Sequence, residues 1–154
     1  MKIIGDGGHA KVVRSFIHRL AHSRVDGYAF IAVGDNASRK REALLAAAAG
    51  YKFPVLIHPS AVVDKSAKIG EGTVIMALAV VQPDSVIGKH CILNTSCSVD
   101  HDCVLEDYVH IGPGAHLCGG VKVGEGTLCG VGSRAVPGAV IGSWGLLRAG
   151  ETAR

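Results

Sequence analysis

Apolar residues return every six positions from residue 57 to the end of the chain. Sixteen consecutive six-residue blocks run from Ile57 to Thr152 without an insertion, and fourteen of their leading residues are aliphatic. A period of six fits neither an α-helix nor a strand of alternating pattern. It is typical of a parallel β-helix, in which each short strand stacks on the next coil. The leading residues are Ile57, Val63, Ile69, Ile75, Val81, Ile87, Leu93, Val99, Leu105, Ile111, Leu117, Val123, Cys129, Ala135, Ile141 and Leu147.

Small or β-branched side chains occupy the fourth position after nearly every leading residue. We expect them at tight corners over a narrow interior. Cys91, Cys97 and Cys103 fall on this position, so we interpret them as small core residues. Neither Cys118 nor Cys129 has a CxxC partner, and the sequence contains no zinc motif. The corner residues are Ala61, Ala67, Thr73, Ala79, Ser85, Cys91, Cys97, Cys103, Val109, Ala115, Val121, Thr127, Ser133 and Ala139.

The first 56 residues follow a different pattern. A short apolar strand at 2–4 leads into a glycine-rich turn, and apolar residues then recur at helical spacing from Val12 to Leu20. A second strand is expected at 28–33 and a second helix at 38–49, with Asn36 or Ser38 as its N-cap and Gly50 after its end. A strand, a glycine-rich turn and a helix together aim backbone N–H groups at an anionic ligand. We therefore predict two domains, 1–56 and 57–154.

Composition and charge exclude some classes of partner. The formal net charge is +3, and the basic residues are scattered without interleaved aromatics, so nucleic acid is not expected as a partner. The first residues lack the apolar stretch of a signal peptide, and no run approaches the roughly eighteen apolar residues of a membrane span. The expected location is the cytoplasm.

Glycine recurs directly behind several leading residues, as in Ile69-Gly70, Ile87-Gly88 and Ile111-Gly112. This pattern resembles the hexapeptide-repeat acyltransferases. The resemblance implies a left-handed β-helix with three blocks per coil, so that residues eighteen apart stack, and it implies a homotrimer. Sixteen blocks then make a little over five coils.

Motifs in both halves of the chain are similar to those of the nucleotide-sugar acetyltransferases that make bacillosamine, perosamine and sialic-acid derivatives. They are Gly-Asp-Gly-Gly-His-Ala-Lys at 5–11, Ala-Val-Gly-Asp-Asn at 32–36, Ile-His-Pro-Ser-Ala at 57–61 and Val-Asp-His-Asp-Cys at 99–103. The resemblance implies that a small α/β domain, 1–56, binds a sugar nucleotide. It also implies that the β-helix, 57–154, binds acetyl-CoA between subunits as a co-substrate, with no tightly bound cofactor. The segment 21–27 is shorter than its counterpart in that family, which usually carries a nucleotide-binding motif there.

His101 is the candidate general base. Transfer of an acetyl group from a thioester to an amine or hydroxyl needs a base for the acceptor's proton and donors for the developing oxyanion. His101 stands two residues after its leading residue, at a position that points out of the coil. Asp100 or Asp102 could orient the imidazole, and the resemblance gives that role to Asp102. We expect direct transfer without a covalent enzyme intermediate.

The other predicted site residues come from the resemblance and from the period. Gly119 follows His101 by eighteen residues, so it is expected one coil above, where its N–H could bind the oxyanion. The resemblance places acceptor contacts at Gly7, Gly8, His9, Gly34, Asn36 and Asn94. It places acetyl-CoA contacts at His110, Gly119, Val131 and Ala149, and it implies no metal.

Two other functions stay open from the sequence. A γ-type carbonic anhydrase would bind zinc through three histidines, but the spacings of His101, His110 and His116 do not reproduce that arrangement. A non-catalytic scaffold is favoured by the short N-terminal domain and by the absence of a final Gly-x-Pro-Ala segment in 144–154. The sequence also leaves open whether an amine or a hydroxyl is acetylated, and whether UDP, GDP, CMP or no nucleotide is attached to the sugar.

Overall fold

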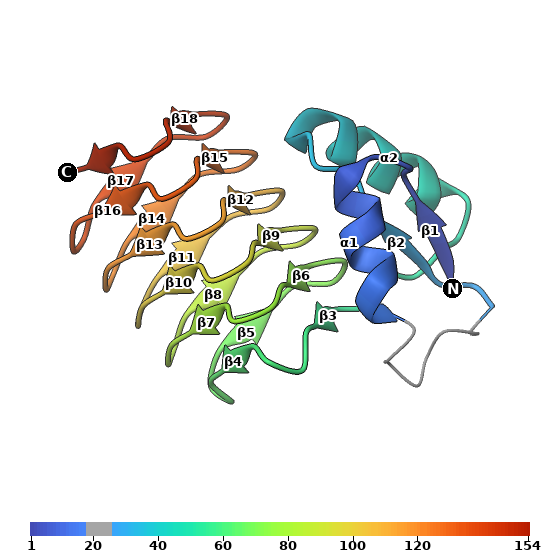
Figure 1. The fold of residues 1–154 in the computed structure, drawn as a ribbon. Helices are drawn as coiled ribbons and strands as arrows, with labels where there is room; N and C mark the ends of the chain where they lie inside the picture. The colour runs from blue at the N-terminus through green and yellow to red at the C-terminus, as the bar shows by residue number, and fades with distance from the viewer. Residues whose placement is uncertain (18–25) are drawn as a thin grey trace.

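The computed structural model describes residues 1–17 and 26–154, and it consists of a small α/β layer beside a long parallel β-helix (Figure 1). The layer contains β1 (Lys2–Ile4), α1 (Gly8–Ile17), β2 (Ala29–Ile31) and α2 (Asn36–Ala48). Strands β1 and β2 pair in parallel, with Ile3 opposite Phe30. This order of elements confirms the strand, glycine turn and helix expected from the sequence. Leu20, the last apolar position of the expected first helix, lies outside the described residues.

Helix α2 begins earlier than predicted. Asp35 is its N-cap, because the Asp35 side chain accepts a hydrogen bond from the Ser38 N–H at 2.8 Å. The prediction of Asn36 or Ser38 as the cap was therefore wrong. An aspartate serves here because its carboxylate reaches the free N–H groups of the first turn. Gly50 follows the helix in the left-handed conformation (φ 81°), as expected.

The β-helix consists of two-residue strands, each ending on a predicted leading residue. They are β3 (Leu56–Ile57), β4 (Val62–Val63), β5 (Lys68–Ile69), β6 (Val74–Ile75), β7 (Val80–Val81), β8 (Val86–Ile87), β9 (Ile92–Leu93), β10 (Ser98–Val99), β11 (Val104–Leu105), β12 (His110–Ile111), β13 (His116–Leu117), β14 (Lys122–Val123), β15 (Leu128–Cys129), β16 (Arg134–Ala135), β17 (Val140–Ile141) and β18 (Leu146–Leu147), followed by β19 (Thr152–Ala153). The hexapeptide register is confirmed over its whole length.

Three parallel sheets form the three faces of the β-helix. The first face is β3-β6-β9-β12-β15-β18, the second is β4-β7-β10-β13-β16-β19, and the third is β5-β8-β11-β14-β17. Paired residues are eighteen apart, as for Ser98 and His116. We call the turns from the first to the second face the middle edge, those from the second to the third face the far edge, and those from the third back to the first face the near edge. The far edge is opposite the first face.

The leading and corner side chains fill the interior. Cys91, Cys97, Cys103 and Cys129 are buried free thiols, as expected for small core residues. Burial raises the pKa of Cys91, Cys97 and Cys129 to about 12, so these thiols stay protonated. Ile57 is the one leading residue that is exposed, at 38%, because no coil precedes it, and Val63, Ile69 and Ile141 near the two ends are partly buried.

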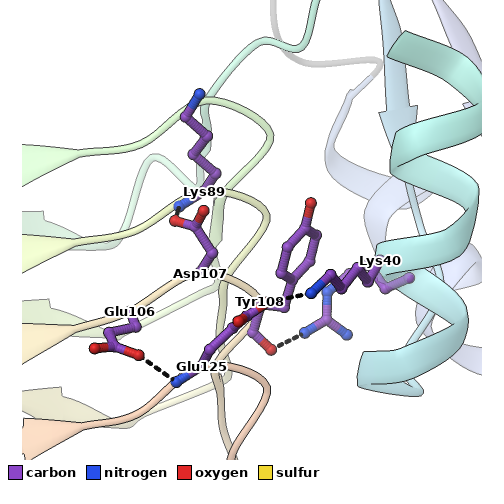
Figure 2. Close-up of polar contacts among 7 residues, drawn as sticks. Lys40, Lys89, Glu106, Asp107, Tyr108 and Glu125 are labelled. Atoms are coloured by element: carbon purple, nitrogen blue, oxygen red, sulfur yellow. Dashed lines mark hydrogen bonds and ion pairs between the residues drawn. The ribbon is translucent and has the colours of Figure 1, made fainter. Parts of the chain in front are cut away.

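The α/β layer covers part of the first face. Leu56, Val74 and Ile92, the outward residues of β3, β6 and β9, pack with Ala10 and Val13 of α1 in one apolar cluster. Helix α2 lies along the near edge. Figure 2 shows Lys40 of α2 reaching Glu125 across this contact, with Tyr108 beside it. Neither described helix is long and apolar enough to cross a membrane.

Candidate active site

His101 and Asp102 form a pair on the far edge, in the turn between β10 and β11. The His101 Nδ1 lies 2.7 Å from the Asp102 Oδ2, and both side chains are about two-thirds exposed. Asp102 holds a left-handed backbone conformation (φ 59°), which aspartate tolerates better than most residues. Of the two neighbouring carboxylates considered from the sequence, it is therefore Asp102 that contacts the imidazole.

This pairing makes the imidazole more basic. The hydrogen bond that the Asp102 carboxylate accepts from the ring is the main cause that raises the pKa of His101 above its ordinary value, and the charges of Asp102 and Asp100 act in the same direction. The Asp102 carboxylate hydrogen-bonds to Nδ1, and no described group hydrogen-bonds to Nε2. The imidazole therefore presents Nε2 to solvent, as a general base requires.

Gly119 lies directly against His101, one coil further along the far edge. A Cβ atom at Gly119 would stand 2.5 Å from His101 Cε1 and 2.7 Å from His101 Nε2. Any side chain at residue 119 would therefore displace the imidazole. The stacking expected from the eighteen-residue spacing is confirmed.

The N–H of Gly119 is available to a ligand. No described residue accepts a hydrogen bond from it. The same turn position is proline, which has no N–H, at Pro59, Pro83, Pro113 and Pro137. The coil thus needs no hydrogen bond from this position, and at Gly119 the N–H belongs to a residue that lies against the imidazole.

The glycine-rich turn after β1 contains one glycine needed for folding and two that are not. At Gly5 (φ 122°) a Cβ would stand 2.5 Å from the Ala32 carbonyl oxygen, so the backbone requires glycine. Gly7 and Gly8 have no positive φ, and a Cβ added at either residue would meet no atom within 4 Å. Packing does not explain these two glycines, and their bare backbone leaves the N-terminus of α1 open to a ligand.

A solvent-open hollow of about 420 Å³ lies at the carboxyl ends of β1 and β2. This is where open parallel α/β layers bind ligands. Its lining includes the polar residues Asp6, Ser38, Arg41 and Glu42, which the sequence analysis did not select. Their positions in the sequence could have indicated this hollow: Asp6 follows β1, and the other three lie in the first turns of α2. The carboxyl ends of parallel strands meet at one edge of a sheet, so these residues were expected to lie together.

Four predicted residues lie together where the α/β layer meets the β-helix: His9 and Gly34 from the layer, and Asn94 and His110 from the β-helix. The Asn94 Nδ2 lies 3.1 Å from the His110 Nε2, and the Gly34 backbone hydrogen-bonds to the His110 ring. A Cβ at Gly34 would stand 3.9 Å from the His9 Cβ. His110, predicted as an acetyl-CoA contact, thus lies in its own chain with the predicted acceptor residues.

Both histidines of this group are neutral at pH 7. Burial is the main cause that lowers the pKa of His9 and of His110 to about 4, and the charge of Arg39 adds to it. The Nε2 of His9 is buried and has no hydrogen-bond partner among the described residues. An unpaired buried nitrogen of this kind can accept from, or donate to, a polar group of a ligand.

The remaining predicted residues lie elsewhere. Asn36 is buried, and both atoms of its amide are engaged: it donates to the Gly126 carbonyl at 2.9 Å and accepts from Arg39 at 2.7 Å. Val131 and Ala149 are exposed and stack on the middle edge, with the Gly150 N–H donating to the Val131 carbonyl. These roles stay predictions.

Within one chain, the two halves of the predicted site are apart. His101 and Gly119 lie on the far edge, whereas the α/β layer, His110 and Asn94 lie on or beside the first face. The β-helix itself stands between them.

The histidines considered for zinc do not converge either. His110 belongs to the first face and His116 to the second, where it pairs with Ser98 at 2.9 Å. Over residues 1–17 and 26–154, no group of three histidine, cysteine or acidic side chains is placed to hold a metal ion. Nothing in this geometry favours the carbonic anhydrase interpretation of the sequence.

Comparison with known proteins gives matches over both halves of the chain. A family profile described as "Bacterial transferase hexapeptide (six repeats)" matches residues 66–101. The acetyltransferase domain of PglB from Neisseria gonorrhoeae is 38% identical, with a TM-score of 0.92 over 98% of this chain and 89% of that domain. The same domain has been solved in complex with acetyl coenzyme A.

Two further relatives are described with a nucleotide-linked sugar in their name or their complex. PerB from Caulobacter crescentus, solved with CoA and GDP-perosamine, is 38% identical with a TM-score of 0.91, over 97% of this chain and 86% of that one. UDP-N-acetylbacillosamine N-acetyltransferase of Bacillus subtilis is 40% identical over 49% of this chain and 50% of its own length. The chain spans about half the length of the curated relatives that it matches.

Proposed function

Because this chain belongs to the bacterial hexapeptide-repeat transferase family, together with sugar acetyltransferases, we propose that it transfers the acetyl group of acetyl-CoA to a sugar. The observation that carries the proposal is the His101–Asp102 pair with the open N–H of Gly119 beside it. This arrangement supplies a base and an oxyanion donor a few ångströms apart, which is what acyl transfer from a thioester needs.

The proposed reaction is a direct transfer. His101 Nε2 takes the proton of the acceptor's amine or hydroxyl as that group attacks the thioester carbon. The negative charge that forms on the carbonyl oxygen is stabilised by the Gly119 N–H, and Asp102 stabilises the imidazolium. When the tetrahedral intermediate collapses, the carbon–sulfur bond breaks, and the imidazolium returns its proton to the leaving thiolate of CoA.

The acceptor proposed is a nucleotide-linked amino sugar. Two of the relatives named above are described with a UDP-linked or a GDP-linked amino sugar. In this chain the open N-terminus of α1 and the neighbouring hollow suit the diphosphate and the nucleoside. Gly7, Gly8 and His9 are the proposed contacts there. Asn94 and His110 are proposed to border the sugar or the thioester.

The proposed active species is a homotrimer with shared sites. The far edge of one chain carries the base, and the first face carries the acceptor residues, so a second copy must bring the two together. A ring of three copies with head-to-tail contacts would do so at three equivalent sites. The compartment proposed is the cytoplasm, in keeping with five free cysteines.

The test is acetyl-CoA consumption with UDP- and GDP-linked amino sugars and with free sialic acid as acceptors. His101→Ala should lower kcat by roughly 10² to 10⁴, the usual cost of losing a positioned base, while acetyl-CoA still binds. His116→Ala is the matched control, since it removes another exposed histidine one coil away. Near-parental kcat in His101→Ala, or no turnover of any acceptor by the parent protein, would refute the proposal. If free sialic acid is the only acceptor that is acetylated, the protein is an O-acetyltransferase.

A further inference from the structure

Three of the five far-edge turns lack the backbone hydrogen bond that closes the turns at the two ends of this edge: the turn at 82–85, the turn with His101 and the turn with Gly119. In the end turns, the backbone closes itself: the Ala67 N–H donates to the Asp64 carbonyl, and the Ala139 N–H donates to the Val136 carbonyl, both at 3.1 Å. Neither site turn makes this bond. The free carbonyl is instead bound by a side chain from the preceding coil.

Ser85 and Cys103 supply these hydrogen bonds. The Ser85 Oγ donates to the Asp100 carbonyl at 2.8 Å, and the Cys103 Sγ donates to the Cys118 carbonyl at 3.2 Å. Both donor side chains are fully buried in the β-helix. Burial also raises the pKa of the Cys103 thiol, so the thiol keeps the proton that it donates.

Only these two interior positions of the far edge can donate. The equivalent residues in the other coils are Ala67, Val121 and Ala139, whose side chains carry no polar hydrogen. The donors therefore occur in the coils where they reach the carbonyls before His101 and Gly119, and in no other coil of this edge.

The carbonyl and the following N–H of a trans peptide point in opposite directions. Cys103 holds the Cys118 carbonyl toward the interior, so the N–H of Gly119 is turned outward, at the edge where His101 also lies. Ser85 acts in the same way on the peptide before His101. An interior hydrogen bond thus holds the carbonyl that precedes each group used in the proposed reaction.

We propose that Cys103 is a positioning residue that fixes the Gly119 N–H as the oxyanion donor, and that Ser85 fixes the backbone of His101. This inference rests on the proposed function. The plainer interpretation is that these bonds only stabilise the coil, because Cys91 makes the same 3.2 Å contact to the Glu106 carbonyl on the near edge, away from the base. That contact provides the control.

The experiment compares Cys103→Val with Cys91→Val. Valine is compatible with both places, since Val121 and Val109 occupy the same positions one coil further on, and it cannot donate. Cys103→Val should lower kcat roughly 10-fold, less than the 10² to 10³ expected for outright loss of an oxyanion donor. Its KM for acetyl-CoA should stay within about two-fold, because positioning acts on the transition state. Cys91→Val should keep the parental kcat, and Cys103→Ser, whose hydroxyl can donate, should recover most of it.

A second measurement does not depend on turnover. The amide resonance of Gly119 and its hydrogen-exchange rate should change in Cys103→Val and not in Cys91→Val. Equal kcat in the two valine variants, no recovery in Cys103→Ser, or an unchanged Gly119 amide would overturn the inference. If Cys103→Val does not fold, Cys103→Ala replaces it, with Cys91→Ala as control. A parent protein that acetylates nothing would refute the proposed function, and the amide measurement would still decide whether Cys103 orients Gly119.

Discussion

At the scale of single residues, the proposed chemistry depends on one short contact between neighbours in sequence. Asp102 both orients the His101 ring and raises its pKa, while the Asp100 charge acts only through space. A base works in its neutral form, so a raised pKa moves the rise of activity to higher pH. In the parent protein this acid limb should lie above pH 6.5, the ordinary value for histidine.

Asp102→Asn tests this assignment. Asparagine also tolerates the left-handed backbone of this turn, so the change removes the charge without straining the chain. The acid limb of kcat/KM should move to lower pH, and the plateau should fall, because the ring loses its orientation and its basicity. Asp100→Asn is the matched control and should move the limb less. A pH profile of kcat/KM for acetyl-CoA measures both, and an unmoved limb in Asp102→Asn would show that another group titrates.

At the scale of elements, α2 is joined to the β-helix by a buried arginine. Arg39 donates to the carbonyls of His90 at 2.8 Å and Tyr108 at 2.7 Å, and Asn36 donates to that of Gly126. These three acceptors are successive corners of the near edge, eighteen residues apart, and all have a left-handed backbone. One turn of α2 thus contacts three coils, which fixes the α/β layer along the β-helix.

Arg39→Met should weaken this junction. The variant keeps a long apolar side chain but leaves the His90 and Tyr108 carbonyls without their donor, at roughly 1–3 kcal/mol for each unpaired buried group. We expect the urea midpoint to fall by the equivalent of at least about 2 kcal/mol. The KM for the acceptor should rise more than that for acetyl-CoA, because the layer carries the proposed acceptor contacts. Arg148→Met, an exposed arginine at the other end, is the control, and an equal midpoint in both variants would contradict this role.

Periodicity explains which of these features the sequence could predict. Each coil must repeat the last, so the leading residues, the buried cysteines and the contact of Gly119 with His101 all followed from the spacing. The docking of the α/β layer has no period. Leu56 and Val74 are outward apolar residues that the layer covers, yet Val62 and Val86 have the same pattern and are exposed. The contacts of Arg39 and the pairing of His110 with Asn94 depend on that docking and could not be read from the spacing.

At the scale of the whole molecule, the proposed site is divided between two surfaces that one chain cannot join. The far edge carries His101, and the first face with its α/β layer carries His9 and His110. If copies of the chain complete each other's sites, a defect on one surface and a defect on the other need not affect the same site. Two inactive variants should then restore activity when they are mixed in one oligomer.

This prediction can be tested with His101→Ala and His9→Ala. Each variant alone should be nearly inactive, the first for want of the base and the second for want of an acceptor contact. In a ring of head-to-tail contacts, random mixing in equal amounts joins an intact far edge to an intact first face at about a quarter of the sites. Co-expression, or unfolding and refolding of the mixture, should therefore recover about that fraction of the parental kcat. Mixing without refolding is the control. Recovery no greater than the sum of the two variants would mean that each chain carries its own complete site.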